Sequence, residues 1–275
     1  MVKDYLVSKR ENSIILRYSS YIIKKIKYYF ALKKLNNEEN ERSRGKLDKR
    51  YDRLRNFRNK YAGESCFIVA TGPSLSLEDL ALIKGKYSFG VNSICKLLNN
   101  TDWKPDFYAI QDSFVYEKLE NEIKKLDMNV FVGGNLSSQF LLPANYIQFP
   151  LNHLYHQAEL DIDRFFSWFS SDSYSVVYDG YSITYSAIQL AIYFGFNKIY
   201  LLGCDCNYPK GEKNHVVESG FVDKYAFKNH DKMITGYQAA KEYADAHDVK
   251  IINCTRGGML EIYPRMNLED VLEEK

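Results

Sequence analysis

The sequence predicts an α/β fold: a Rossmann-like, mostly parallel sheet flanked by helices, with an N-terminal helical extension. Short runs rich in β-branched and aromatic residues alternate with helical patterns over most of the chain, which is typical of parallel sheets wrapped by helices. Charge separates the two parts, because residues 1–60 hold 18 Lys/Arg against 7 Asp/Glu, and the remainder holds 19 against 28. We therefore expect a basic helical extension at residues 1–60 and a compact domain at residues 61–275.

The extension is expected to contain an amphipathic helix. Apolar and aromatic residues recur near helical spacing over residues 14–32, with lysines between them. These charges leave the stretch short of the roughly 20 apolar residues that a membrane-spanning helix needs. The helix could lie on an anionic membrane surface, or pack on the body or on a second subunit of a homo-oligomer. Residues 36–60 predict a polar break followed by a charged helix.

Seven short runs and two helical patterns define the elements of the body. The predicted strands are residues 66–70, 87–91, 107–110, 130–132, 146–149, 198–202 and 250–253. Residues 77–82 are expected to be helical, and residues 181–195 form the clearest helix, with Gly195 in the position that ends many helices.

Composition argues against several classes of protein. Five scattered cysteines, an odd number, do not make a disulfide framework, which favours a reducing cytoplasm. Cys204 and Cys206 have no second pair at ligand spacing, so no metal site is expected. No secretory signal is visible in the charged first ten residues, and the acidic body gives no reason to bind nucleic acid. We expect a cytoplasmic protein that is peripheral on the inner membrane face if the helix binds there.

A candidate phosphate-binding turn follows the first predicted strand and consists of Thr71, Gly72, Pro73 and Ser74. Glycine lets the backbone come close to a ligand, proline fixes the turn, and serine offers a hydroxyl. The start of a helix at the carboxyl end of a strand is where open α/β sheets bind phosphate. The turn matches neither the dinucleotide fingerprint nor the P-loop, which disfavours dehydrogenases and P-loop ATPases. An ordinary βα turn remains the alternative.

Other polar residues follow strand ends or begin a helix. Asn92, Asp112 and Asp205 come within three residues of the ends of predicted strands, and Ser182 and Thr184 fall in the first turn of the clearest helix. Because the carboxyl ends of parallel strands meet at one edge of a sheet, these groups are expected to share a crevice with Ser74. Each one alone is also explained as a turn or cap residue.

Histidine and arginine side chains could complete such a site. His215 and His230 fall in the loop-rich stretch after residue 205, where a histidine could accept a proton from a hydroxyl. The other three histidines look peripheral. Arg256 could clamp a phosphate or a sugar carboxylate, or it could form a surface salt bridge.

Several co-linear motifs resemble the 6-hydroxymethylpterin diphosphokinase-like domain family and, more distantly, the bacterial sialyltransferases that modify lipooligosaccharide. The motifs are residues 67–75 with Asn92, residues 180–184 with 189–191 and 195–196, residues 199–205, Asn214-His215, and residues 253–261. The last two look like signatures of the subgroup encoded among polysaccharide-assembly genes. The resemblance covers about residues 61–270.

The resemblance to the sialyltransferases implies a metal-independent transfer from a cytidine nucleotide. It implies that Gly72, Ser74, Asn92 and Ser182 contact the nucleotide. It further implies Tyr208 at the leaving phosphate and His215 or His230 as the base.

The resemblance to the diphosphokinases implies ATP and magnesium instead, with the carboxylates of Asp112 and Asp205 holding the ion. Such proteins commonly show Gly-Asn-Gly-Pro-Ser at the turn, and this chain reads Ala70-Thr71 before Gly72. One nucleotide contact of the common form is therefore absent.

These observations favour a glycosyltransferase that uses a nucleotide-activated sugar, preferably a CMP-sugar, to modify a surface polysaccharide or lipooligosaccharide. Its acceptor would be a glycan or a lipid-linked molecule, and no permanently bound cofactor is expected. The alternatives are an ATP-dependent diphosphokinase acting on a pterin-like alcohol, and a non-catalytic nucleotide-binding homologue. The candidate catalytic residues are Asp205, Tyr208, His215 and His230. The candidate nucleotide-binding residues are Thr71, Gly72, Pro73, Ser74, Asn92, Asp112, Ser182, Thr184 and Arg256.

Overall fold

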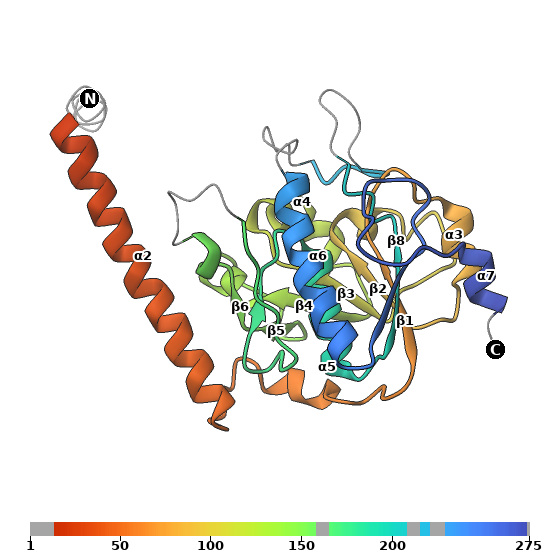
Figure 1. Ribbon diagram of the computed structural model, residues 1–275, viewed down its shortest axis with the longest axis horizontal. Coiled ribbons are helices and arrows are strands. Elements are labelled where there is room, and N and C mark those ends of the chain that lie inside the picture. Colours follow the sequence, from red (N-terminus) through yellow and green to blue (C-terminus); the bar gives the residue numbers. More distant parts are fainter. Residues whose placement is uncertain (1–13, 158–164, 208–214, 221–228, 274–275) are drawn as a thin grey trace.

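The computed structural model describes residues 14–157, 165–207, 215–220 and 229–273, and its centre is a seven-stranded sheet (Figure 1). The strands are β1 (Ser65–Val69), β2 (Ser88–Val91), β3 (Phe107–Ile110), β4 (Asn129–Gly133), β5 (Ile147–Phe149), β8 (Lys198–Leu202) and β9 (Lys250–Asn253). Their order is β5-β4-β3-β2-β1-β8-β9, and every neighbouring pair is parallel. The predicted α/β class is confirmed, and all seven predicted strands are present.

Helices cover both faces of the sheet. The helices of the body are α3 (Leu77–Leu82), α4 (Ser113–Ile123), α5 (Ile183–Phe194), α6 (Asn229–Ala246) and α7 (Leu268–Glu273). The 3-10 helices are η1 (Asp52–Phe57), η2 (Asn92–Lys96), η3 (Gly134–Ser138) and η4 (Tyr155–Gln157), and β6 (Leu151–Asn152) pairs with β7 (Val177–Tyr178) in a second small sheet.

Alternation along the strands explains these two layers, because successive side chains of a strand point to opposite faces. In β1, Cys66 and Ile68 pack in a core cluster with α5, α6 and η1, whereas Phe67 and Val69 pack with α3 and α7. A third cluster joins β3 and β4 to α4. A parallel sheet covered on both faces requires continuous apolar runs, which is why its strands were visible in the sequence.

Helix α5 lies against the sheet almost entirely buried and begins at the edge where the strands end. The Ser182 hydroxyl caps it by accepting a hydrogen bond from the Thr184 N–H at 3.2 Å. Gly195 ends it in the left-handed conformation at φ 100°, and an added Cβ there would lie 2.9 Å from the backbone nitrogen of Ala62. The predicted helix at residues 181–195 is confirmed to within two residues, and both of its signals act as expected.

The N-terminal helix differs from the expectation. Helix α2 (Ile14–Ser43) continues through residues 36–40, where the sequence predicted a polar break (Figure 1). Two polar side chains in this stretch bond to the body instead of ending the helix. Asn36 Oδ1 accepts a hydrogen bond from Asn152 at 3.2 Å, and Glu39 accepts one from the Tyr178 hydroxyl at 2.6 Å. Tertiary contacts of this kind override a weak local propensity.

The segment after α2 also differs from the expected charged helix. It forms turns and the short helix η1, and it places Tyr51, Leu54 and Phe57 in the core cluster of the body. Phe57 stacks on Phe194 of α5 with ring centroids 4.9 Å apart. The packed body therefore reaches back to Tyr51. Within the described residues, no helix combines the length and apolarity that crossing a membrane requires.

All five cysteines are buried with free thiols, and burial raises the pKa of each of them. Thiols of this kind react slowly because the thiolate is the nucleophile. We expect less than one thiol per chain to react promptly with a disulfide reagent such as DTNB in the folded protein, and all five to react in denaturant. Prompt reaction of two or more thiols in the native state would contradict this packing.

Candidate functional site

A pocket of about 470 Å³ opens at the carboxyl ends of β1, β2, β3 and β8, beside the start of α5. The chain passes from β1 outward to β5 on one side, then returns to add β8 and β9 on the other side of β1. Open α/β sheets bind their ligands at such a point of reversal. The pocket is in the size range of small-molecule sites.

The turn after β1 is held tightly against the end of β8. The Gly72 N–H donates to the Gly203 carbonyl at 2.8 Å, and a Cβ on Gly72 would lie 2.5 Å from that oxygen and would overlap the Asp205 carboxylate. The Ser74 hydroxyl donates to Asp205 Oδ2 at 2.7 Å. Only glycine fits at position 72, and the turn and Asp205 form one rigid wall of the pocket.

Not every residue of the predicted turn faces the pocket. Thr71 and Gly72 line it, whereas Pro73 and Ser74 lie behind it, where Ser74 fixes Asp205. Ser76 and Asp79 form the expected capping box at the start of α3. The candidates that do line the pocket are Thr71, Gly72, Asn92, Asp112, Ser182, Thr184, Asp205 and His215.

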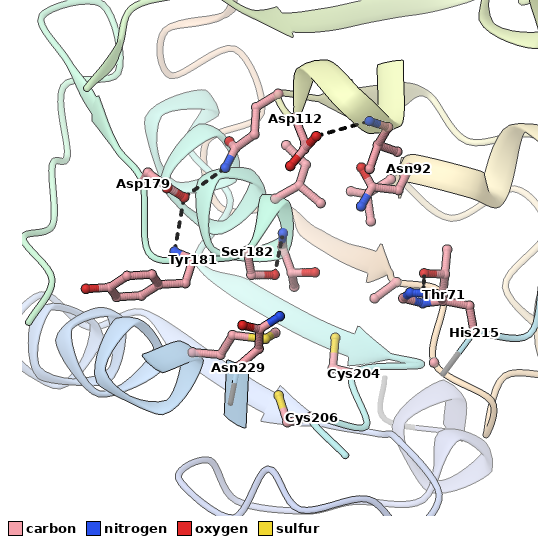
Figure 2. A pocket seen from close by; sticks show the side chains of 18 of the residues that line it. Thr71, Asn92, Asp112, Asp179, Tyr181, Ser182, Cys204, Cys206, His215 and Asn229 are labelled. Carbon is pink, nitrogen blue, oxygen red and sulfur yellow. Dashed lines mark hydrogen bonds between the residues drawn. The ribbon is translucent and has the colours of Figure 1, made fainter. Parts of the chain in front are cut away.

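The N-terminus of α5 forms the middle of the pocket, between its two ends in Figure 2. Ser182, Ile183 and Thr184 all line the cavity. The first N–H groups of a helix have no intrahelical acceptor, and the helix dipole adds positive potential at this end. Gly180 is required just before the helix, because a Cβ there would overlap the ring of Tyr185. This part of the pocket is suited to an anionic group.

His215 lies beside the Gly72 turn. Its Nδ1 is 3.0 Å from the Thr71 hydroxyl (Figure 2). The Val216 N–H donates to the Thr71 carbonyl at 2.8 Å. Burial lowers the pKa of His215, so the ring is neutral at pH 7. A neutral imidazole on the wall of a pocket can accept a proton.

Two other predicted site residues lie elsewhere. His230 is in the first turn of α6 and not in a loop, and its Nδ1 donates to the Cys206 carbonyl at 2.8 Å, outside the pocket lining. Arg256 also lies outside the lining, where its guanidinium pairs with the Asp79 carboxylate at 2.6 Å. This is the salt bridge that the sequence left open as an alternative. Tyr208 and Asn214 fall outside the described residues.

Asp112 and Asn92 each combine a structural role with a place in the pocket. Asp112 caps α4, because its Oδ1 accepts hydrogen bonds from the N–H groups of Phe114 at 2.8 Å and Val115 at 3.0 Å. Asn92 begins η2 with a left-handed backbone at φ 47°. Both line the cavity.

The far end of the pocket contains Asp179 and Tyr181 (Figure 2). Gln111, Asn135 and His153 also line the pocket, and none of these five residues was among the predicted site residues. Asp179 Oδ1 accepts hydrogen bonds at 3.0 Å from both the Gln111 amide and the Tyr181 N–H. Burial raises the pKa of Asp179 to about 6. His153 was expected to be peripheral, and its place in the lining corrects that expectation.

Strained backbone and some of the unsatisfied polar atoms belong to residues that line this cavity. The side-chain oxygens of Asn92, Gln111 and Asn135 are buried and have no hydrogen-bond partner among the described residues. Asn92, Tyr181 and Cys206, which all line the pocket, have positive φ angles of 47°, 64° and 50°. Buried acceptors without donors and left-handed non-glycine residues are both costly, and both concentrate at ligand sites. Each of the three oxygens has almost no accessible area, so a ligand in the pocket would reach them only after their side chains turn.

His156 lies just outside the far end, with its ring 4.2 Å from that of Tyr181 and its Nε2 3.7 Å from Asp179. Burial lowers the pKa of His156 to about 4, so this approach is not an ion pair at neutral pH. Protonation below the unfolded value of about 6.5 favours the unfolded chain, so stability is lost as the pH falls through that value.

We expect His156→Phe, which keeps a ring against Tyr181, to remove about 1–2 kcal/mol of the stability loss between pH 7 and pH 5. Urea unfolding of both proteins at pH 7, 6 and 5 measures this difference. Asp179 also titrates in this range, but it is present in both proteins, so its contribution to stability cancels in the comparison. Equal losses in the two proteins would show that His156 is not held neutral.

Two observations on metal binding come from the part of the chain that the structure describes. No group of three or more His, Cys, Asp or Glu side chains there is placed to hold an ion. Asp112 and Asp205 are two carboxylates in one pocket, and magnesium brought by a nucleotide usually needs only one or two. The pair is thus compatible with a magnesium–nucleotide complex.

The fold and the pocket together define a Rossmann-like α/β protein with a pocket at the reversal point of its sheet. A family profile described as 6-hydroxymethylpterin diphosphokinase MptE-like matches residues 43–211. Because this match covers more than half of the chain, the protein belongs to the MptE-like family. No curated protein sequence gives a significant match.

Two solved structures are similar to this chain. One is the MAf glycosyltransferase from Magnetospirillum magneticum AMB-1, at 15% identity and a TM-score of 0.44, covering 78% of this chain and 37% of that one. The other is the sialyltransferase CstII from Campylobacter jejuni in complex with cytidine-5'-monophosphate, at 15% identity and a TM-score of 0.44, covering 74% of this chain and 85% of that one. This chain thus spans little more than a third of the MAf protein.

Proposed function

We propose that the protein is a glycosyltransferase that takes a sugar from a nucleotide donor, with a CMP-sugar favoured, and transfers it to a hydroxyl of a glycan or lipid-linked acceptor. The product would belong to a surface polysaccharide or lipooligosaccharide. The observation that supports this most is the convergence of the Gly72 turn, the α5 N-terminus, Asp205 and His215 on one pocket. The sequence resemblance to the lipooligosaccharide sialyltransferases favours the cytidine donor.

In this proposal the two ends of the pocket have different tasks. The nucleotide lies against the Thr71-Gly72 turn and Asn92, and its phosphate lies near the first N–H groups of α5. The Gln111 and Asn135 side chains line the pocket, and in this proposal they turn so that their oxygens accept hydrogen bonds from sugar hydroxyls. Asp179, which bonds to the Gln111 amide, also lines the pocket, and its raised pKa makes it protonated in part near pH 6.

His215 is the proposed base of the transfer. The acceptor hydroxyl oxygen attacks the anomeric carbon, the bond between that carbon and the phosphate oxygen breaks, and the nucleoside phosphate leaves. The hydroxyl proton passes to the neutral His215 ring, whose pKa is lowered by burial. Negative charge develops on the phosphate, where the α5 N-terminus stabilises it.

The second candidate is a diphosphate transfer from ATP to a pterin-like alcohol, which is the activity in the description of the family. The observation that favours it is the presence of Asp112 and Asp205 in the same pocket as the phosphate-binding elements. These carboxylates would hold the magnesium ion that accompanies ATP.

Calorimetric titration with CMP, CDP, UDP and ATP, each with and without magnesium, separates the two functions. We expect CMP to bind without magnesium, because the start of α5 offers backbone N–H groups and the positive potential of the helix dipole to the phosphate, and a carboxylate-held ion is not needed. Binding of ATP only, and only with magnesium, would replace the first proposal by the second. Nucleotide binding without donor hydrolysis or transfer would identify a non-catalytic nucleotide-binding homologue.

A further inference from the structure

One face of helix α2 contacts the body, and the opposite face carries exposed apolar residues. The body-facing side is marked by Tyr28, Asn36, Glu39 and Arg42, which hydrogen-bond respectively to Leu154, Asn152, Tyr178 and Ser175. These positions follow the three- and four-residue spacing of one helix face. Figure 1 shows α2 along the edge of the molecule, with one long side toward the body and the other facing away.

The opposite side carries an outer stripe, which we define as Ile22, Ile23, Ile26, Tyr29 and Phe30. The positions 22, 26, 29 and 30 share one face because they are four, seven and eight residues apart. Ile23 is 53% exposed, Ile26 50%, Tyr29 61% and Phe30 62%, so the described part of the chain leaves the stripe open to solvent. Several large apolar side chains exposed next to one another mark an interaction surface.

The charges beside the outer stripe indicate what it binds. Residues 14–37 hold six Lys/Arg and no Asp or Glu. Lys24, Lys27, Lys33 and Lys34 are all exposed around the stripe. An α2 helix from a second copy would bring these lysines against one another, with no acidic partner in this part of either helix. An anionic surface avoids that repulsion.

We propose that α2 binds the anionic headgroups of a lipid bilayer, with the outer stripe inserted at the headgroup boundary. Tyr29 and Phe30 supply aromatic rings at that depth, and the lysines extend their ammonium groups to the lipid phosphates. The helix lies in the plane of the surface, and its other face keeps the body attached through the four hydrogen-bonded side chains. This inference is independent of the donor and of the reaction, and goes beyond the proposed function.

Co-sedimentation with lipid vesicles tests the proposal on the full chain. The probe is phosphatidylcholine vesicles containing about one third phosphatidylglycerol, compared with phosphatidylcholine alone. We expect binding to the anionic vesicles that weakens as salt is raised, and little binding to the neutral ones. The variant Ile26→Glu/Phe30→Glu should bind at least roughly tenfold more weakly. The variant Lys24→Gln/Lys27→Gln/Lys34→Gln should bind about 100-fold more weakly.

The matched control is Leu141→Glu, which adds a charge at an apolar residue that is 94% exposed on the body. It should bind vesicles as the unchanged protein does. All variants alter exposed positions, and circular dichroism and the melting temperature verify that they fold. Failure of the unchanged protein to bind anionic vesicles, or equal binding by the Ile26→Glu/Phe30→Glu variant, would overturn the proposal. The proposal would also be overturned if the unchanged protein formed a dimer in solution, did not bind the vesicles, and became a monomer in the Ile26→Glu/Phe30→Glu variant.

Discussion

Substitution of Gly72 by alanine is expected to lower CMP affinity at least roughly tenfold and to destabilise the fold by about 2–4 kcal/mol. The added Cβ would lie 2.5 Å from the backbone oxygen of Gly203 and would overlap the Asp205 carboxylate. The Gly203 oxygen cannot move without disturbing the end of β8. The turn itself must therefore shift, and with it the wall of the pocket. Calorimetric CMP titration and urea unfolding measure the two effects.

The control for Gly72→Ala is Gly85→Ala. Gly85 has a φ of 80° and nothing within 4 Å of an added Cβ, so this change costs only backbone strain of about 1 kcal/mol. It should leave CMP binding unchanged. A milder second variant, Ser74→Ala, removes the 2.7 Å hydrogen bond to Asp205 without any overlap. Wild-type CMP affinity in the Gly72→Ala protein would contradict the assignment of this turn to the nucleotide.

Substitution of His215 by alanine is expected to lower the rate of sugar transfer about 10²–10⁴-fold while leaving CMP binding within a few-fold of the wild type. The base must be neutral to accept the proton, and burial lowers the pKa of His215. The rate should therefore be maintained as the pH falls through 6.5, the usual histidine value, and decline only in more acid solution. Release of CMP from a CMP-sugar, measured from pH 5 to pH 8 for both proteins, gives the loss of rate in the variant and the pH dependence of the rate.

Two further variants complete the His215 experiment. His247→Ala changes an exposed residue that follows α6 and should leave the rate unchanged. His230→Ala should cost less than tenfold, because its ring bonds to the Cys206 carbonyl outside the pocket lining. A large loss in the His230 variant with none in the His215 variant would reverse the assignment of the base.

The fold was predictable wherever burial leaves a local signal. Strands covered on both faces need continuous apolar runs, and the seven strands were found for that reason. The α5 helix has a serine cap and a terminal glycine within its own sequence. By contrast, β6 and β7 are two residues long and too short to show a pattern. The course of α2 through residues 36–40 depends on contacts with Asn152 and Tyr178, far away in the sequence.

The candidate site was predictable at the strand ends and at the start of α5, and His215 was also among the predicted residues that line the pocket. Thr71, Gly72, Asn92, Asp112 and Asp205 follow strands whose carboxyl ends must meet at one sheet edge. The other features of the site depend on contacts between residues that are far apart in the sequence.

Arg256 pairs with Asp79, which is 177 residues away. Asp179 gains its raised pKa from burial that no local pattern reveals. Gln111 was adjacent to a recognised candidate, and its place directly after a predicted strand was the signal that could have identified it.

A crystal structure with bound CMP tests the central claim most directly. The account predicts the phosphate within hydrogen-bonding distance of the first N–H groups of α5 or of the Thr71-Gly72 turn, with the nucleoside beside Asn92. CMP bound at another place, such as the hollow lined by Arg256 and Asn267 near α7, would contradict it. So would a CMP molecule in this pocket that contacts neither the turn nor the start of α5.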